Sequence, residues 1–225
     1  MSALSVIYED NQILVVNKTA GLLVQGDKTG DKSLIDLAKK YIKEKYQKPG
    51  EVFLGLVHRL DRPTTGVIVL ARTSKALSRL SQQFKERVPK KKYKAIVSGT
   101  PESEATLENF LKKKPSKNKS YHYPKNTPNT KKAILHYRVV KQLKSYHVLD
   151  IELETGRHHQ IRAQLAAVGL HIKGDLKYGA KRPNKNGSIH LHARSLTLIH
   201  PTKKEEMTFL APTPDDVVWN ASLAD

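Results

Sequence analysis

The chain has 225 residues, 38% of them hydrophobic and 27% charged, which is enough apolar material to bury the core of a globular protein. Lys and Arg number 40 against 21 Asp and Glu, and the formal net charge of +19 favours a polyanionic partner, above all nucleic acid. Cysteine is absent, which excludes disulfides and thiolate metal sites. The longest apolar runs, such as residues 67–71, are too short to span a bilayer. We therefore expect a cytoplasmic protein with no membrane partner.

The first elements are predicted by short apolar runs and by capping residues. Residues 6–8 and 13–16 form a predicted pair of strands joined by a turn. Ser33 is the expected N-cap of a helix that extends to about Tyr46. Residues 52–59 are predicted to be extended and to lead, through a turn, to a buried strand.

A second predicted helix begins at about Ser74 and carries apolar residues on one face. Residues 93–98 alternate like a strand, which would point Tyr93, Ala95 and Val97 to the same side. That side could face a cleft.

Residues 112–132 contain eight lysines and almost no aliphatic side chains. This composition predicts a loop, which is either simply solvated or a mobile clamp for RNA, and the two interpretations are compatible.

The last third of the chain is predicted to contain strands at residues 133–142 and 146–154, a helix at about 158–168 that ends at Gly169, and extended segments at 189–199 and 206–210. Strands that look antiparallel, with a few helices among them, indicate the α+β class and a single catalytic domain over residues 1–225.

The segment that points most directly to chemistry is residues 57–71, where Asp61 lies on a tight turn between Arg59 and Arg62 and apolar runs flank the turn. Taken alone, the pattern fits a structural turn residue or a catalytic carboxylate. However, the string His58-Arg59-Leu60-Asp61-Arg62-Pro63-Thr64-Thr65-Gly66 resembles the signature of the RluA family of RNA pseudouridine synthases. Thr65 stands where that family usually has Ser.

Three further segments resemble motifs of the same family in the same order. The first runs from Tyr8 to Leu22, with Thr19 in place of the usual Pro, and the second is residues 92–97. The third is residues 153–162, followed by Gly174-Asp175, Tyr178-Gly179 and residues 191–193. The resemblance covers about residues 6–201.

The resemblance implies a long, bent, mostly antiparallel mixed sheet with flanking helices and a central active-site cleft. It implies an isomerase that converts uridine to pseudouridine in structured rRNA or tRNA, without a cofactor and with no DNA partner. Many relatives carry an N-terminal S4-type domain. This chain begins too close to the first motif to hold one, so we expect a monomer whose catalytic domain itself grips the RNA.

By the same resemblance, Asp61 is the catalytic carboxylate, Arg162 orients it and keeps it ionised, and Tyr93 lies against the target base. The uridine must first be flipped out of its stack, and Arg59 is expected to fill the gap that it leaves. Weaker candidates for contacts with phosphate or loops are Arg157, His159, Gln160 and Lys18.

Two alternatives remain open at this point. One is a non-catalytic RNA-binding module on the same fold, which would not need Asp61, Tyr93 and Arg162 together. The other is a metal-dependent RNA phosphodiesterase, which the ten histidines together with Asp61 and Asp175 suggest. His158 and His159 are adjacent, and His190 and His192 would share a strand face, a spacing that metal sites use.

Overall fold

The computed structural model describes residues 4–27 and 30–223. The chain forms two compact units. The first comprises Met1–Pro89 and Ala193–Thr213, and the second comprises Lys90–His192 and Pro214–Asp225.

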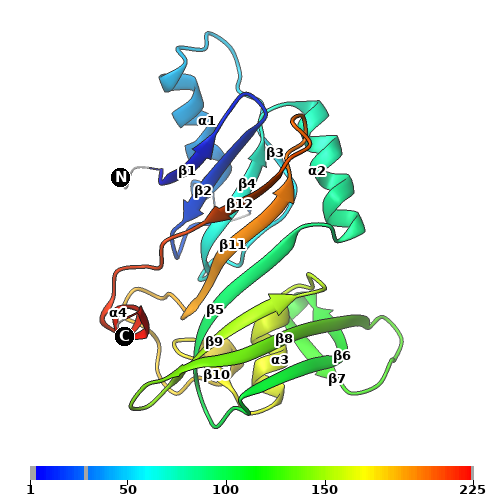
Figure 1. Cartoon of the computed structure of the whole chain (residues 1–225), viewed down its shortest axis with the longest axis vertical. Coiled ribbons are helices and arrows are strands. Elements are labelled where there is room, and N and C mark those ends of the chain that lie inside the picture. Colours follow the sequence, from blue (N-terminus) through cyan, green and yellow to red (C-terminus); the bar gives the residue numbers. More distant parts are fainter. Residues whose placement is uncertain (1–3, 28–29, 224–225) are drawn as a thin grey trace. The chain divides into compact units, whose positions relative to one another are not determined.

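The first unit is built on a sheet with the strand order β1-β2-β4-β11, in which β3 pairs with β4 and β12 pairs with β11 (Figure 1). The strand bounds are Val6–Glu9 (β1), Ile13–Lys18 (β2), Gly55–Leu56 (β3), Thr65–Ala71 (β4), Leu191–Ile199 (β11) and Glu206–Leu210 (β12). Every residue of β4 is buried, because this strand has neighbours on both sides and apolar side chains on both faces. β4 is therefore the central strand of the unit.

Two helices flank this sheet, α1 (Leu34–Lys45) and α2 (Ser74–Glu86). The predicted N-cap of α1 is confirmed, since Ser33 and Asp36 form a reciprocal capping box. The cap of α2 is Thr73 rather than Ser74, because the Thr73 side chain accepts the backbone N–H of Ala76. The predicted extended segment 52–59 contains only the two-residue strand β3.

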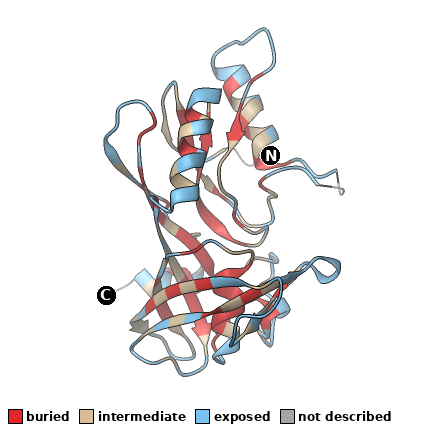
Figure 2. Ribbon diagram, turned by 90° about the vertical axis from the view of Figure 1, so that its right-hand side faces the viewer, coloured by how far each residue is buried: buried red, intermediate tan, exposed pale blue. Residues whose placement is uncertain are grey.

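The second unit contains an antiparallel sheet with the order β5-β9-β8-β6-β7, and β10 pairs with β5. The strand bounds are Lys90–Ser98 (β5), Glu104–Lys114 (β6), Lys119–Tyr123 (β7), Lys131–Gln142 (β8), His147–Leu153 (β9) and His171–Ile172 (β10). Buried residues concentrate in the strands, while the strand ends and connecting turns are exposed (Figure 2).

The two faces of β5 pack against different helices. Ala95 and Val97 lie in a core that includes Ile161 and Leu165 of α3 (Gln160–Ala167), and Tyr93 packs against the same core. Ile96 faces the other way and packs with Trp219 of α4 (Val217–Leu223). The predicted alternation of β5 is therefore confirmed.

The lysine-rich segment 112–132 is not the loop that its composition predicts. It contains the end of β6, a short 3₁₀ helix (η1, Pro115–Lys117), β7 and the start of β8, so it is largely a β-hairpin. Lysine does not disfavour a strand when backbone pairing and a buried opposite face hold it in place.

The α+β class is confirmed by both units, in each of which antiparallel strands are flanked by helices. No helix in residues 4–27 or 30–223 is long and apolar enough to cross a membrane.

Candidate active site

Asp61 is half-buried on the turn that leads into β4 of the first unit. The turn is closed by the backbone N–H of Thr64, which donates to the carbonyl oxygen of Asp61 at 3.0 Å. Leu60 and Thr64, on either side of it, are buried, whereas Arg59 is exposed. The carboxylate is thus carried by a turn whose neighbouring residues are anchored in the core.

The first family-like motif and the Asp61 turn are joined by two reciprocal hydrogen bonds, one from the backbone and one from a side chain. Gly21 N–H donates to the carbonyl of Arg62, and Arg62 Nε donates to the carbonyl of Gly21, both at 2.9 Å. Arg62 also forms an ion pair with Asp31 at 2.9 Å. These bonds fix the chain directly after Asp61.

Lys18 completes this arrangement from inside the protein. Its residue is only 1% exposed, and Nζ donates to the carbonyl oxygens of Thr19 and Leu22 at 2.9 Å and of Arg62 at 3.1 Å. Burial lowers the pKa of Lys18 to about 7, and the nearby Asp61 carboxylate opposes this fall. Lys18 therefore ties two loops together beside Asp61 from a buried position.

The residues around Asp61 in the signature also have structural roles. His58 Nε2 accepts the N–H of Val69 in β4, and the His58 ring stacks on Phe84 of α2 at 4.8 Å. Gly66 has φ of +118°, and a Cβ atom there would lie 2.3 Å from the carbonyl oxygen of Ala193. Only glycine allows that approach.

Arg162 lies on α3 in the second unit and is 4% exposed. Its Nε and Nη2 donate to the two carboxylate oxygens of Asp175 at 2.7 and 2.8 Å. Such a bidentate pair fixes the plane of the guanidinium as well as its position. Asp175, which is 2% exposed, thereby orients Arg162.

Tyr178 extends this network to the lysine-rich hairpin. Its ring lies 5.0 Å from the Arg162 guanidinium. Its hydroxyl donates to the carbonyl of Ser120 in β7 and accepts the N–H of the same residue, and it lies 3.0 Å from Nδ1 of His159. Tyr178 therefore joins its own segment to α3 and to β7.

His159 is held in this network as a neutral ring. Burial lowers its pKa to about 2, with the positive charge of Arg162 as the next cause. Because the Tyr178 hydroxyl already donates to Ser120, Nδ1 of His159 is the donor to it. His159 also has the left-handed conformation, with φ of 53°, directly before α3.

Tyr93 is half-buried on β5, opposite Ile151 of β9, and packs on the core that α3 covers. Arg162 and Tyr93 thus belong to the second unit, and Asp61 belongs to the first.

The comparisons with known proteins agree on one family. The sequence profile described as RNA pseudouridylate synthase matches residues 12–167. The chain is 35% identical over 243 residues to the ribosomal large subunit pseudouridine synthase D of Haemophilus influenzae, covering 99% of this chain and 72% of that protein. The chain belongs to the RluA family of RNA pseudouridine synthases.

Two further comparisons support this membership. The synthase D of Vibrio cholerae is 32% identical over 229 residues, covering 96% of this chain and 69% of that protein. The solved structure of human RNA pseudouridylate synthase domain containing 4 superposes with a TM-score of 0.80 at 26% identity, covering 93% of this chain and 88% of that chain. The family's enzymes convert uridine in RNA to pseudouridine, and this pseudouridine synthase is such an isomerase.

Two of the weaker RNA-contact candidates in this pseudouridine synthase are engaged inside the protein. Gln160 is 3% exposed, donates through Nε2 to the carbonyl of Ile134, and accepts bonds from Thr155 and from the backbone of Arg157. Together with the buried ring of His159, it organises the start of α3. Both side chains are buried and bonded within the second unit, and their predicted contacts with RNA stay a prediction.

Arg59 and Arg157 are accessible, and Arg157 is anchored by a bond from Nε to the carbonyl of Lys132 at 2.9 Å. In the pair His190 and His192, considered as metal ligands, His190 already has other partners. Its ring stacks on Trp219 and forms hydrogen bonds with Asn184 and Asp216. No group of metal-binding side chains occurs in the part of the chain that the structure describes.

Sequence reasoning considered Asp175 only for the metal-dependent alternative and gave no role to Tyr178 or Ser120. The first two lie in segments that were matched to the family, so the signal was present. Their function is visible only through the contacts that join α3, β7 and the 175–178 segment.

Proposed function

We propose that this enzyme modifies large-subunit ribosomal RNA and that Asp61 is its catalytic carboxylate. Relatives over almost the whole chain are named ribosomal large subunit pseudouridine synthase D. The observation that carries the assignment of Asp61 is its turn, which is fixed by the bonds of Lys18 and Arg62 and leads into the buried strand β4. A carboxylate can act as a nucleophile or stabilise the separated sugar, and a defined position favours either role.

Arg162 and Tyr93 are proposed to act with Asp61 on the same uridine, so that the two units work as one catalytic domain. A guanidinium favours the ionised form of a carboxylate and orients it. The bidentate pair with Asp175 supports this role, because it would present Arg162 in one orientation. Tyr93 would lie against the base and assist removal of the proton from C5.

Arg59 is proposed to occupy the space that the flipped uridine leaves. It is exposed and lies two residues before Asp61. A planar guanidinium can stack where a base was. We place the enzyme in the cytoplasm, as a monomer, with RNA neutralising its charge of +19.

The test is a transcriptome-wide map of pseudouridine in cells that lack this protein, compared with cells restored by the intact chain or by Asp61→Ala. We expect one or a few sites in large-subunit rRNA to disappear and to return only with the intact chain. Lost sites confined to tRNA would overturn the proposed substrate. Sites that return with Asp61→Ala would overturn the catalytic role.

A further inference from the structure

The lysine-rich hairpin presents a basic face that the chemistry at Asp61 does not explain. Leu111 and Lys113 lie on the same side of β6, and their cross-strand neighbours on that side include Ser120 of β7 and Lys131 of β8. Leu111 is covered by the core that contains Ala163 and Tyr178. Lys113 and Lys131, farther toward the end of the sheet, are exposed.

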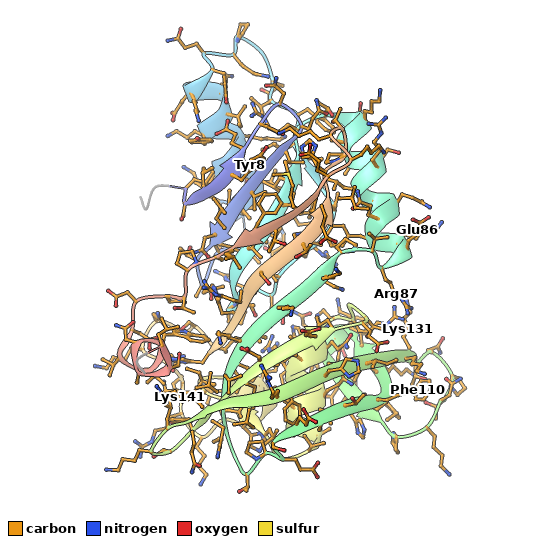
Figure 3. The ribbon with its side chains drawn as sticks, in the orientation of Figure 1. Tyr8, Glu86, Arg87, Phe110, Lys131 and Lys141 are labelled. Carbon is orange, nitrogen blue, oxygen red and sulfur yellow. The ribbon has the colours of Figure 1, made fainter. Side chains whose placement is uncertain are left out.

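These side chains line a pocket of about 330 Å³ within the second unit. Its polar wall combines residues from the hairpin, from the turn before β8 and from the segment before α3, namely Lys113, Ser120, Asn129, Lys131, Arg157 and His158. None of the described residues that line it is acidic. Figure 3 shows Lys131 at the end of the sheet where β8 begins.

The wall of the pocket is held in place by internal bonds. Arg157 is anchored through Nε to the carbonyl of Lys132. The ring of His158 lies 2.9 Å from Oγ of Ser120 and 3.1 Å from Oδ1 of Asn118, while Oγ of Ser120 donates to the carbonyl of His158. Both ring nitrogens of His158 thus have a hydrogen-bond partner within the second unit. Arg157, His158 and Ser120 are therefore held in defined positions in the wall of the pocket.

The opposite face of the same strands provides a contrast. There Lys132 forms an ion pair with Glu108 at 2.6 Å. In the described part of the chain, neither Lys113 nor Lys131 is paired with a carboxylate. These two lysines are therefore not neutralised by a carboxylate of the described residues, and the repulsion between their charges costs free energy unless an anion is bound.

We propose that this pocket binds phosphodiester groups of the RNA substrate, with Lys113, Lys131 and Arg157 supplying the charge and Asn129 a neutral hydrogen-bonding group. The proposal rests on the RNA-modifying function above and deepens it. Arginine and lysine are the usual ligands of phosphate oxygens, and such contacts position the RNA without reading its sequence.

The test compares Lys113→Ala and Lys131→Ala with Lys114→Ala, which removes the same charge from the exposed, opposite side of β6. Binding of a 12-nucleotide oligouridylate is measured by fluorescence anisotropy across a series of salt concentrations. We expect each pocket variant to weaken binding about threefold to tenfold at low salt and to reduce the salt slope by about 0.7 per lost phosphate contact. Lys114→Ala should change both quantities far less.

Equal effects of Lys113→Ala and Lys114→Ala would show a response to net charge alone and would overturn the pocket. A second arm replaces chloride by inorganic phosphate at constant ionic strength. Free phosphate should compete only weakly with the oligonucleotide, and tighter binding of phosphate than of RNA would contradict a phosphodiester site.

Turnover distinguishes a failure of this inference from a failure of the proposed function. With ribosomal RNA as substrate, the pocket variants should raise KM and leave kcat near that of the wild type, since no pocket lysine belongs to the Arg162 network. If the pocket variants are active with an unchanged KM, the proposal that the pocket binds phosphodiester groups is overturned, while the proposed function stands. Absence of pseudouridine formation by the wild-type protein on this RNA would sink the proposed ribosomal substrate while the binding comparison still stands.

Discussion

The two units hold their key charged residues by different means. In the first unit the turn of Asp61 is fixed through backbone carbonyls, which accept bonds from the buried side chain of Lys18 and from the exposed side chain of Arg62. In the second unit Arg162 is fixed by side chains, with Asp175 in its plane and Tyr178 beneath it. A turn can be positioned by capturing its backbone, whereas a long flexible guanidinium needs partners for its own nitrogens.

The largest effect on stability should come from breaking the network around Arg162. In Arg162→Ala the buried carboxylate of Asp175 loses both of its guanidinium bonds. We expect the free energy of unfolding, measured with urea, to fall by about 3–5 kcal/mol. The proposed catalytic role predicts a loss of kcat as well.

A double variant separates the two consequences. Arg162→Met combined with Asp175→Leu removes both charges, so most of the stability should return while activity stays lost. If the double variant is as unstable as the single one, the stranded carboxylate is not the cause of the instability.

Lys18→Met tests the carbonyl capture in the first unit. Its three acceptors would lose their donor, so the Asp61 turn should loosen, kcat should fall and RNA affinity should be kept, because Lys18 is buried. A loss of RNA affinity with normal kcat would contradict this account and would instead support the predicted contact of Lys18 with phosphate. Lys48→Met, at an exposed position, is the matched control.

The lowered pKa of Lys18 also predicts that the free energy of unfolding depends on pH. The pKa of Lys18 is lowered to about 7 in the folded protein, so between about pH 7 and 10 the unfolded chain holds more protons at this site. The stability of the wild type relative to Lys18→Met should therefore rise over this range, by at least about 1 kcal/mol. Unfolding at pH 7 and pH 9.5 measures it, and a constant difference would contradict the lowered pKa.

The smallest predicted change concerns His159. Its pKa of about 2 lies below the ordinary value of 6.5, so acidification below pH 6.5 favours the unfolded state, which takes up the proton. His159→Asn keeps a residue that tolerates the left-handed conformation and removes the titrating group. Between pH 7 and pH 5 the variant should lose about 1–2 kcal/mol less stability than the wild type.

The control for this change is His122→Asn, at an exposed position of β7. It should leave the acid dependence as in the wild type. If His122→Asn flattens the curve as much as His159→Asn, the effect does not arise from the buried ring.

Much of the fold was predictable because local signals agreed with the tertiary structure. Ser33 caps α1 as its type and position indicate, and the alternation of β5 places Tyr93 with Ala95 and Val97. The hairpin of the lysine-rich segment was not predictable, because β7 is held by pairing with β6 and by Tyr178 rather than by its own apolar residues. Composition alone cannot report such long-range bonds.

For the site, the resemblance identified the segments, but it could not reveal which side chains support which. Lysine is usually exposed in folded proteins, so the sequence gives no reason to expect that Lys18 is buried and bonds carbonyl oxygens. Asp175 was matched within a motif, yet its bond to Arg162 spans 13 residues and a turn of chain. Roles of this kind need coordinates.

The central claim is that the Asp61 carboxylate performs the chemistry, and Asp61→Asn tests it most directly because only charge and one oxygen are changed. The measurement is pseudouridine formation in ribosomal RNA in a single turnover, with RNA affinity measured on the same protein. We predict that product formation is abolished while affinity stays within about threefold of the wild type. Product formation by Asp61→Asn at a rate near that of the wild type would contradict the account.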